Sequence, residues 1–119
     1  ADTVVVLDGK VLGKPRNEKN AREMLKSLSG KTHDVITGVT LSSNSRTVSF
    51  SSVTKVHFAS LSDAEIDFYI KEYKPLDKAG AYGIQEWIGY IGIKGIEGCY
   101  YNVMGLPLQD LYHHLRDFD

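Results

Sequence analysis

Two runs of alternating residues, 35–41 and 48–58, constrain the fold more than any other feature of this chain. In both runs apolar or threonine side chains recur at every second position, which is typical of strands with one buried face. The polar residues 42–45 predict a turn, so the second run should return as an antiparallel partner of the first. The alternation loses phase at Ser51 and Ser52, where we expect a bulge or bend.

Another strand is predicted near the start, where residues 4–7 (Val-Val-Val-Leu) follow Asp2 and Thr3. An uninterrupted apolar run is typical of a buried strand, and Asp8–Gly9 after it signals a hairpin turn. Carboxylates at strand ends of α/β proteins tend to face a ligand. Asp2 could therefore hold a divalent cation or activate water, and the Thr3 hydroxyl could donate to or accept from a ligand. An equally open alternative is that Asp2 only solvates the strand end.

Three helices are expected. Asn17 suits the N-cap of the first, and Gly30 suits its left-handed stop. Ser62 and Glu65 form a capping box that starts the second. Pro107 suits the first position of the last helix, whose leucines should share one side.

Glycines are concentrated between residues 80 and 105, which hold seven of the eleven in the chain. We expect a helical turn at 84–88 and then short strands over 89–103, separated by glycine turns. The glycines could also let the backbone approach a ligand closely, which a Cβ would prevent. Both interpretations stay open.

Composition limits the classes of function. At 119 residues the chain is one domain at most, and its formal net charge of −1 argues against nucleic acid as the main partner. The single cysteine, Cys99, fits a reducing compartment. No apolar run approaches the ~18 residues that span a bilayer. We therefore expect a cytoplasmic protein with neither a nucleic-acid nor a membrane partner.

Lys14 is a candidate phosphate-binding residue. It stands between Gly13 and Pro15, and such a rigid loop can aim a lysine at a phosphate. The loop is not a Walker loop, because the glycine-rich lead-in and the following Ser or Thr are absent. The alternative, for any single lysine, is a solvated surface charge.

The most specific segment runs from Asp77 to Gln85 (DKAGAYGIQ). Its small residues 79–81 would let the backbone approach a ligand, and Lys78 could contact a phosphate. The Gln85 amide can donate and accept at once, as reading a base edge requires. The alternative is a turn leading into a helix, with Asp77 as its cap and Lys78 exposed.

Other chemistry-bearing residues are weaker candidates. His113 and His114 are adjacent and point to different helix faces, so they make a poor metal pair. His33 and His57 lie in predicted strands and are expected to be packing or surface residues. Cys99 lacks a recognisable nucleophile signature.

Six collinear segments together resemble the Maf family of nucleoside triphosphate pyrophosphatases, once described as septum formation inhibitors. Each segment is weak alone, but in this order they extend the resemblance over essentially the whole chain. The segments are ADTVV at 1–5, LGKP at 12–15, MLKSLSG at 24–30, HDVITGV at 33–39, DKAGAYGIQ at 77–85 and YNVMGLPL at 101–108.

The resemblance implies an α/β fold with an elongated mixed β-sheet, flanking helices and a deep cleft, related to the inosine triphosphate pyrophosphatases. It implies cleavage of a nucleoside triphosphate substrate between its α and β phosphates, with a divalent metal cation (Mg or Mn) as cofactor. Asp2 matches the family's catalytic acidic residue and would also be its metal ligand. Lys14 matches its phosphate-binding lysine, with Lys78 as a second phosphate partner.

The same resemblance bears on substrate choice. The combination of Thr3 and Gln85 is similar to that found in the subgroup acting on dTTP and UTP. Modified pyrimidine nucleotides are a further expected substrate class. Glu86–Trp87 replaces the glycine more often found after the glutamine. The alternative function is a non-catalytic, nucleotide-binding regulator of septum formation or cell division.

Family members begin with a Ser-x-Ser-Pro-Arg-Arg loop, whose arginines contact the phosphates, and carry a further glutamate downstream of it. Neither occurs in this sequence. We therefore expect residues 1–119 to be a Maf-like domain that is incomplete at its N-terminus and has little or no activity alone. A homodimer is an assembly that the sequence leaves open.

Overall fold

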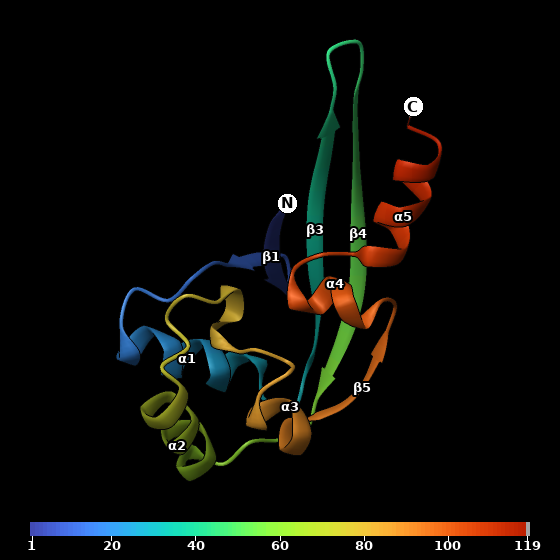
Figure 1. Ribbon diagram of the computed structural model, residues 1–119. Coiled ribbons are helices and arrows are strands. Elements are labelled where there is room, and N and C mark those ends of the chain that lie inside the picture. Colours follow the sequence, from blue (N-terminus) through green and yellow to red (C-terminus); the bar gives the residue numbers. More distant parts are fainter. Residues whose placement is uncertain (119) are drawn as a thin grey trace.

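The computed structural model describes residues 1–118 and is built around one five-stranded sheet of order β2-β1-β3-β4-β5 (Figure 1). The expected α/β architecture, an elongated sheet with flanking helices, is confirmed. In chain order the elements are β1 (Asp2–Leu7), β2 (Lys10–Leu12), α1 (Glu18–Leu28), β3 (Thr32–Ser42), β4 (Thr47–Phe58), α2 (Asp63–Tyr73), the 3₁₀ turn η1 (Ala79–Ala81), α3 (Trp87–Gly92), β5 (Ile93–Glu97), α4 (Tyr100–Met104) and α5 (Leu108–Arg116).

The β3–β4 hairpin pairs without interruption along the full length of β3. The bulge expected at Ser51 and Ser52 is therefore wrong. Ser52 is buried and its hydroxyl donates to Asp110 at 2.8 Å, so a polar residue holds a core position without any change of register. An irregularity of β4 lies instead in its pairing with β5, between His57 and Phe58.

β1 lies between β2 and β3. Asp8 and Gly9 make the predicted turn to β2 with φ angles of +50° and +79°, the left-handed pair that a two-residue hairpin favours. All four strand pairings within residues 1–118 are antiparallel, whereas the resemblance implies a mixed sheet. Tight turns account for two of these pairings, because they join β1 to β2 and β3 to β4 and a tight turn returns the chain antiparallel. Longer segments that contain helices connect β1 to β3 and β4 to β5.

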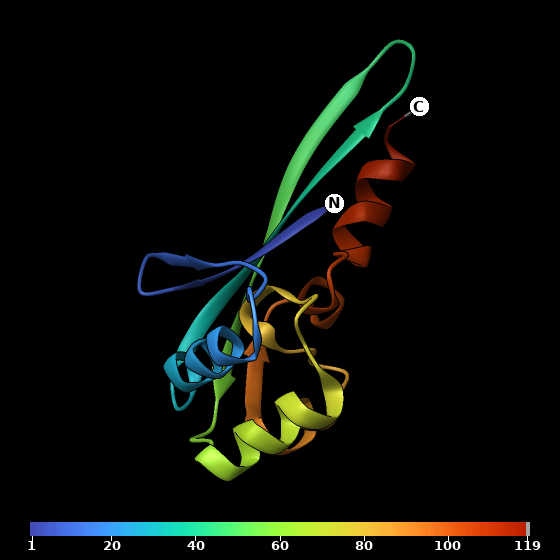
Figure 2. The ribbon, with the colours of Figure 1, turned by 90° about the vertical axis from the view of Figure 1, so that its left-hand side faces the viewer.

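One sheet face is buried against the helices. α1 begins after the predicted N-cap Asn17 and is followed by Gly30 at φ +71°, and α2 begins with the predicted capping box. Figure 2 shows the β3–β4 hairpin extending well beyond this helical body, with α5 beside it. The molecule is accordingly elongated, measuring 52 × 27 × 26 Å. The core residues of α1, α2 and the three central strands are Val5, Leu7, Ala21, Leu25, Leu28, Val35, Val56, Phe58, Ile66, Tyr69 and Ile70.

Residues 84–103 differ from the prediction. The helical turn expected at 84–88 is displaced to α3, and the short strands expected over 89–103 reduce to β5 followed by α4. Gly89 accounts for part of the error: a Cβ there would lie 1.8 Å from the carbonyl oxygen of Ile84. This glycine permits close backbone packing at the start of α3 and does not mark a turn between strands.

α5 forms where it was predicted, but its apolar side is not buried. Leu108, Tyr112 and Leu115 are 44%, 63% and 52% exposed. The helix contacts β4 through its other side, where His114 stacks on Phe50 with ring centres 3.9 Å apart.

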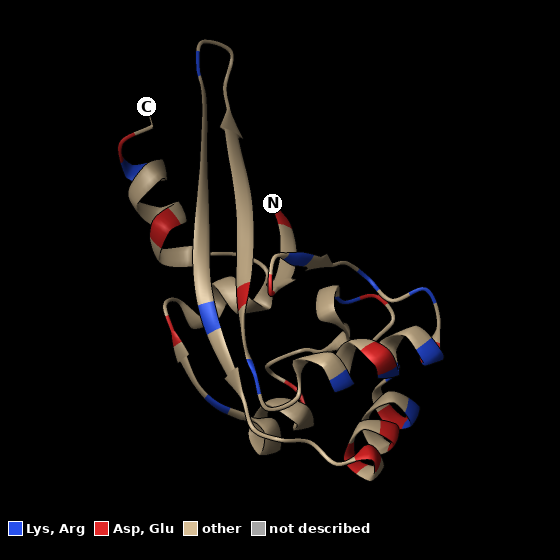
Figure 3. Cartoon of the chain, turned by 180° about the vertical axis from the view of Figure 1, so that it is seen from behind, with Lys and Arg blue, Asp and Glu red and all other residues tan. Residues whose placement is uncertain are grey.

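Charged side chains are interspersed by sign. Figure 3 shows positive and negative residues intermingled over α1 and α2, while the long hairpin is mostly uncharged. This distribution differs from the basic stripe that typifies a nucleic-acid surface. In the described part of the chain, every helix is too short or too polar to cross a membrane.

Candidate functional site

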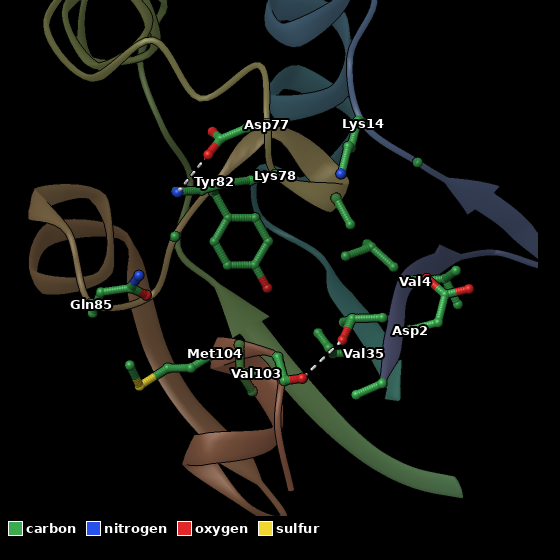
Figure 4. A pocket seen from close by; sticks show the side chains of 17 residues that line it. Asp2, Val4, Lys14, Val35, Asp77, Lys78, Tyr82, Gln85, Val103 and Met104 are labelled. Atoms are coloured by element: carbon green, nitrogen blue, oxygen red, sulfur yellow. Dashed lines mark hydrogen bonds and ion pairs between the residues drawn. The ribbon is translucent and has the colours of Figure 1, made fainter. Parts of the chain in front are cut away.

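A pocket of about 500 Å³ lies where β1, the loop after β2, the segment before α3 and the end of α4 meet (Figure 4). This volume is in the range of small-molecule sites. Residues from separate parts of the sequence line it together, including all five predicted site residues: Asp2, Thr3, Lys14, Lys78 and Gln85.

Asp2 and Thr3 project from opposite faces of β1, because side chains alternate along a strand. The Thr3 hydroxyl lies 2.9 Å from the Thr37 hydroxyl of β3 and donates to the Gly105 carbonyl oxygen at 3.4 Å. Asp2 is exposed, and Figure 4 shows its carboxylate across the strand from the Tyr82 ring. Thr3 therefore faces the pocket, and Asp2 stands at its rim.

The loops that carry the two lysines are joined by a backbone hydrogen bond from the Gly80 N–H to the Gly13 carbonyl oxygen, 3.1 Å. Lys14 follows Gly13 directly and is exposed, while the next residue, Pro15, is buried. The side chain of Lys14 thus extends from an anchored loop, in agreement with the rigidity expected of this segment.

The small residues after Lys78 serve packing more than ligand approach. Gly80 and Ala81 are buried, and both have left-handed φ angles, +72° and +64°. A Cβ on Gly80 would lie 3.0 Å from a methyl carbon of Val5. Because the loop is packed against β1, only half-buried Ala79 of this trio lines the pocket.

The ammonium groups of the two lysines do not converge. The Lys78 ammonium lies 3.6 Å from the Asp77 carboxylate, and Figure 4 shows it directed away from Lys14. Asp77 thus pairs with Lys78 and does not cap the following helical turn. Lys14 makes no ion pair with any residue of the described chain.

Gln85 lies in a turn that is closed by a hydrogen bond from the Glu86 N–H to the Gly83 carbonyl oxygen, 3.0 Å. Ile84, beside it, is 6% exposed and anchors the turn in the core. Gln85 itself is exposed, and its amide is directed toward the pocket in Figure 4.

The polar groups of the pocket are separated in space. Figure 4 shows Gln85 and Met104 at one end and Lys14 and Asp2 at the other. A ligand that spans the pocket would therefore meet the Gln85 amide and Met104 at one end and Lys14 and Asp2 at the other.

A buried histidine–tyrosine pair, which the sequence did not single out as functional, supports the inner wall. Nε2 of His33 lies 2.6 Å from the Tyr82 hydroxyl, and both rings pack edge-on against Phe58. Desolvation by burial lowers the pKa of His33 to about 4, although the nearby Asp34 carboxylate acts in the opposite direction. Burial raises the pKa of Tyr82, so both side chains are neutral near pH 7.

The donor set of this pocket suits a cation that arrives with its ligand. Within residues 1–118, no group of three or more His, Cys, Asp or Glu side chains could hold a metal ion. The lining carboxylates are Asp2 and Asp77, and Asp77 is already paired with Lys78. Mg²⁺ typically binds one or two carboxylates together with substrate phosphates and water, an arrangement that needs only Asp2 from the protein.

Sequence reasoning missed part of the lining. Tyr82 and Gly83 lie inside the segment 77–85, which was already a candidate because of Lys78 and Gln85, so a sequence signal for them was present. Val103 and Met104 reach the pocket from α4, and nothing in their local pattern indicates this, because short strands were expected there.

The fold and site define an α/β protein whose pocket is suited to an elongated anionic ligand with an uncharged polar end. The sequence matches the family described as "Maf-like protein" over residues 1–118. This chain belongs to the Maf family.

Relatives with curated names match this chain over nearly all of its residues. The chain is 66% identical over 116 residues to a protein named dTTP/UTP pyrophosphatase from Phocaeicola vulgatus, covering 98% of this chain and 60% of that protein. Proteins of the same name from Porphyromonas gingivalis and Bacteroides thetaiotaomicron are each 58% identical; the matches cover 99% and 98% of this chain and 59% and 60% of those proteins. The chain therefore spans about 60% of the length of the curated relatives it matches.

Proposed function

We propose that this Maf protein is a nucleoside triphosphate pyrophosphatase that hydrolyses dTTP and UTP to the monophosphate and pyrophosphate. The observation that carries the proposal is the separation of an amide end from a charged end within one pocket. The relatives' printed name, dTTP/UTP pyrophosphatase, supplies the substrate class. That name also favours an enzyme over the alternative of a non-catalytic regulator of septum formation.

In the proposed binding mode the base lies near Gln85 and Thr3, and the triphosphate extends toward Lys14. The Gln85 amide can pair with both a donor and an acceptor on the edge of a pyrimidine. The free ammonium of Lys14 is suited to the phosphates, whereas Lys78 contributes less because Asp77 offsets its charge.

In the proposed reaction a water oxygen bonds to the α phosphorus, while the bond from that phosphorus to the oxygen bridging the β phosphate breaks. Pyrophosphate leaves with the electron pair. Asp2 orients the water and accepts its proton, and Lys14 stabilises the charge that develops on the leaving group.

A divalent cation, Mg or Mn, fits this scheme as a companion of the substrate. Asp2 would hold it together with the triphosphate, and the cation would neutralise phosphate charge. The protein's own contribution to this scheme is the exposed carboxylate of Asp2 at the pocket rim.

The test is pyrophosphate release from a panel of nucleoside triphosphates by the full-length protein and its Asp2→Asn variant. We expect preference for dTTP and UTP, and a loss of kcat of about 10²-fold or more in the variant, in the range typical of a removed general base. Asp8→Asn is a matched control, because Asp8 is exposed in the hairpin turn at the far end of the same strand and asparagine tolerates its left-handed backbone. Full activity in Asp2→Asn would remove Asp2 from the catalytic role.

Three further expectations belong to this proposal: a cytoplasmic location, a homodimer and a role in nucleotide-pool cleaning. Sedimentation of the purified protein tests the dimer, and a sedimentation coefficient of a monomer would contradict it.

A further inference from the structure

A single buried hydroxyl holds both ends of the turn that carries Gln85. Tyr69 projects from α2 and is fully buried. Its hydroxyl accepts a hydrogen bond from the Gly83 N–H at 3.0 Å and donates to a carboxylate oxygen of Glu86. Gly83 and Glu86 are the first and last residues of that turn, so the Tyr69 hydroxyl connects the two ends of the turn.

The surroundings reinforce this bridge. Burial, and then the hydrogen bond to Glu86, raise the pKa of Tyr69, so the hydroxyl keeps the proton that it donates. One residue earlier on α2, the Phe68 ring packs edge-on against Trp87, with ring centres 4.9 Å apart. Two successive aromatic side chains of α2 therefore hold the turn and the residue that follows it.

Space around the turn is tight as well. A Cβ on Gly83 would lie 3.0 Å from a carbon of the Lys78 side chain and 3.1 Å from the Glu86 carboxylate. Glu86 and the Lys78 side chain therefore lie close to Gly83, which lines the pocket. Within the described chain, neither Tyr69 nor Glu86 belongs to that lining, so they can affect base recognition through the two turn residues that do, Gly83 and Gln85.

We propose that Tyr69 and Glu86 are positioning residues for base recognition, which hold the Gln85 amide where it meets the pyrimidine edge. This inference rests on the proposed function. An amide distinguishes a uracil or thymine edge from a cytosine edge only while its distance and direction are constrained, because hydrogen bonds weaken steeply with misalignment. Glu86 stands where the resemblance leads us to expect glycine, and a glycine there could not make the side-chain bond to Tyr69.

The test measures base selectivity in the full-length protein. Calorimetry with α,β-methylene analogues of dTTP, UTP and CTP gives the affinity ratio between matching and mismatching bases. For Tyr69→Phe, which removes both hydrogen bonds of the hydroxyl, and for Glu86→Ala, which removes the bond to the carboxylate, we expect this ratio to fall about tenfold or more, because a hydrogen bond to a charged group typically contributes at least that much. Glu86→Gln should restore most of it, since an amide oxygen can still accept from Tyr69.

Two controls separate positioning from general damage. Tyr73→Phe removes the hydroxyl of a tyrosine that stacks on Tyr69 with ring centres 5.1 Å apart but is 40% exposed; it should leave the ratio unchanged. Inorganic triphosphate, which has no base, should bind all variants equally. Hydrogen exchange of the Gly83 amide should be faster in Tyr69→Phe than in Tyr73→Phe.

The outcomes are distinguishable from failure of the proposed function. If the wild-type protein binds the matching analogues selectively but hydrolyses no triphosphate, the proposed pyrophosphatase activity is overturned. If Tyr69→Phe then loses the selective binding, the present inference is nevertheless supported. An unchanged ratio in Tyr69→Phe, no preference in the wild type, or an equal loss of affinity for inorganic triphosphate would overturn the inference.

Discussion

Nε2 of His33 lies 2.6 Å from the hydroxyl oxygen of Tyr82, and the histidine is 2% exposed. A side chain that normally titrates near neutrality is therefore enclosed in apolar surroundings next to a pocket. Its Nδ1 atom has no hydrogen-bond partner in the described structure. Protonation of this ring would place a positive charge in the core, which the nearby Asp34 carboxylate offsets only in part.

The first prediction concerns stability against acid. Because burial lowers the pKa of His33 from 6.5 to about 4, the unfolded chain binds more protons than the folded one between these values. The free energy of unfolding should therefore fall as the pH falls from 6.5 toward 4, by about 3 kcal/mol for this group. Urea unfolding, followed by the fluorescence of Trp87 across this window, measures the slope.

His33→Gln should flatten that slope even if it lowers stability overall. His113→Gln is the control, because His113 is exposed on α5. An unchanged slope in His33→Gln would show that other groups cause the acid sensitivity.

The second prediction concerns Asn102, which is fully buried and ties α4 to the sheet. Its side-chain amide lies within hydrogen-bond distance of the Val35 and Ser52 carbonyl oxygens and the Thr54 hydroxyl, at 3.0 to 3.2 Å. Asn102→Asp replaces this donor with a buried negative charge facing two carbonyl oxygens, and we expect a loss of about 3 kcal/mol or more in the free energy of unfolding.

Asn44→Asp is the control, because Asn44 is exposed in the turn between β3 and β4; it should change stability by less than about 0.5 kcal/mol. Equal effects of the two substitutions on the urea midpoint would contradict the assigned role of Asn102.

The third prediction concerns Gly80, where the loop meets β1. Alanine there must adopt φ +72° and place its Cβ 3.0 Å from Val5. Gly80→Ala should therefore lower the free energy of unfolding by about 1–3 kcal/mol and weaken nucleotide binding, because Lys78 lies on the same loop. Gly95→Ala, at a strand position with nothing within 4 Å of the added carbon, should change neither quantity appreciably. Thermal unfolding and nucleotide titration of both variants measure the two effects.

The fourth prediction ranks the two lysines. Lys14 has no ion-pair partner among the described residues, whereas Lys78 is paired with Asp77. Lys14→Ala should therefore raise the KM for dTTP more than Lys78→Ala does, by about tenfold or more against a few-fold, since the free charge interacts fully with the phosphates. Lys74→Ala, on the exposed residue that ends α2, serves as the control. A larger effect of Lys78 would contradict this ranking.

Sequence reasoning succeeded where a signal is local. The Asp8–Gly9 turn, the Asn17 N-cap and the Ser62 capping box each depend on side chains within a few residues of one another. Such contacts form in the same way whatever the rest of the chain does. The alternation of the long hairpin is local as well, although Ser52 shows that a buried polar residue can imitate a loss of phase.

Errors arose where a partner distant in sequence decided the outcome. Residues 79–81 were interpreted as small enough to let the backbone approach a ligand, but Gly80 is packed against Val5, far away in the chain. Residues 89–103 were expected to form several short strands, but β5 is the single strand there, and α3 and α4 lie on either side of it. Glycine spacing alone cannot separate a turn from a close contact between two elements.

The sequence by itself determined the strands, the two capped helices and the short list of residues able to hold a phosphate or read a base, because these depend on periodicity and on the chemistry of single side chains. Only the tertiary structure decided how those residues are arranged. It brings Thr3 and Gln85 to one pocket, leaves Asp2 at its rim, and turns the Lys78 ammonium away from Lys14. It also places the Tyr69 hydroxyl beneath the Gln85 turn. The direction of a side chain depends on which strand face, loop or helix it packs against, and those contacts join residues that are far apart in the chain.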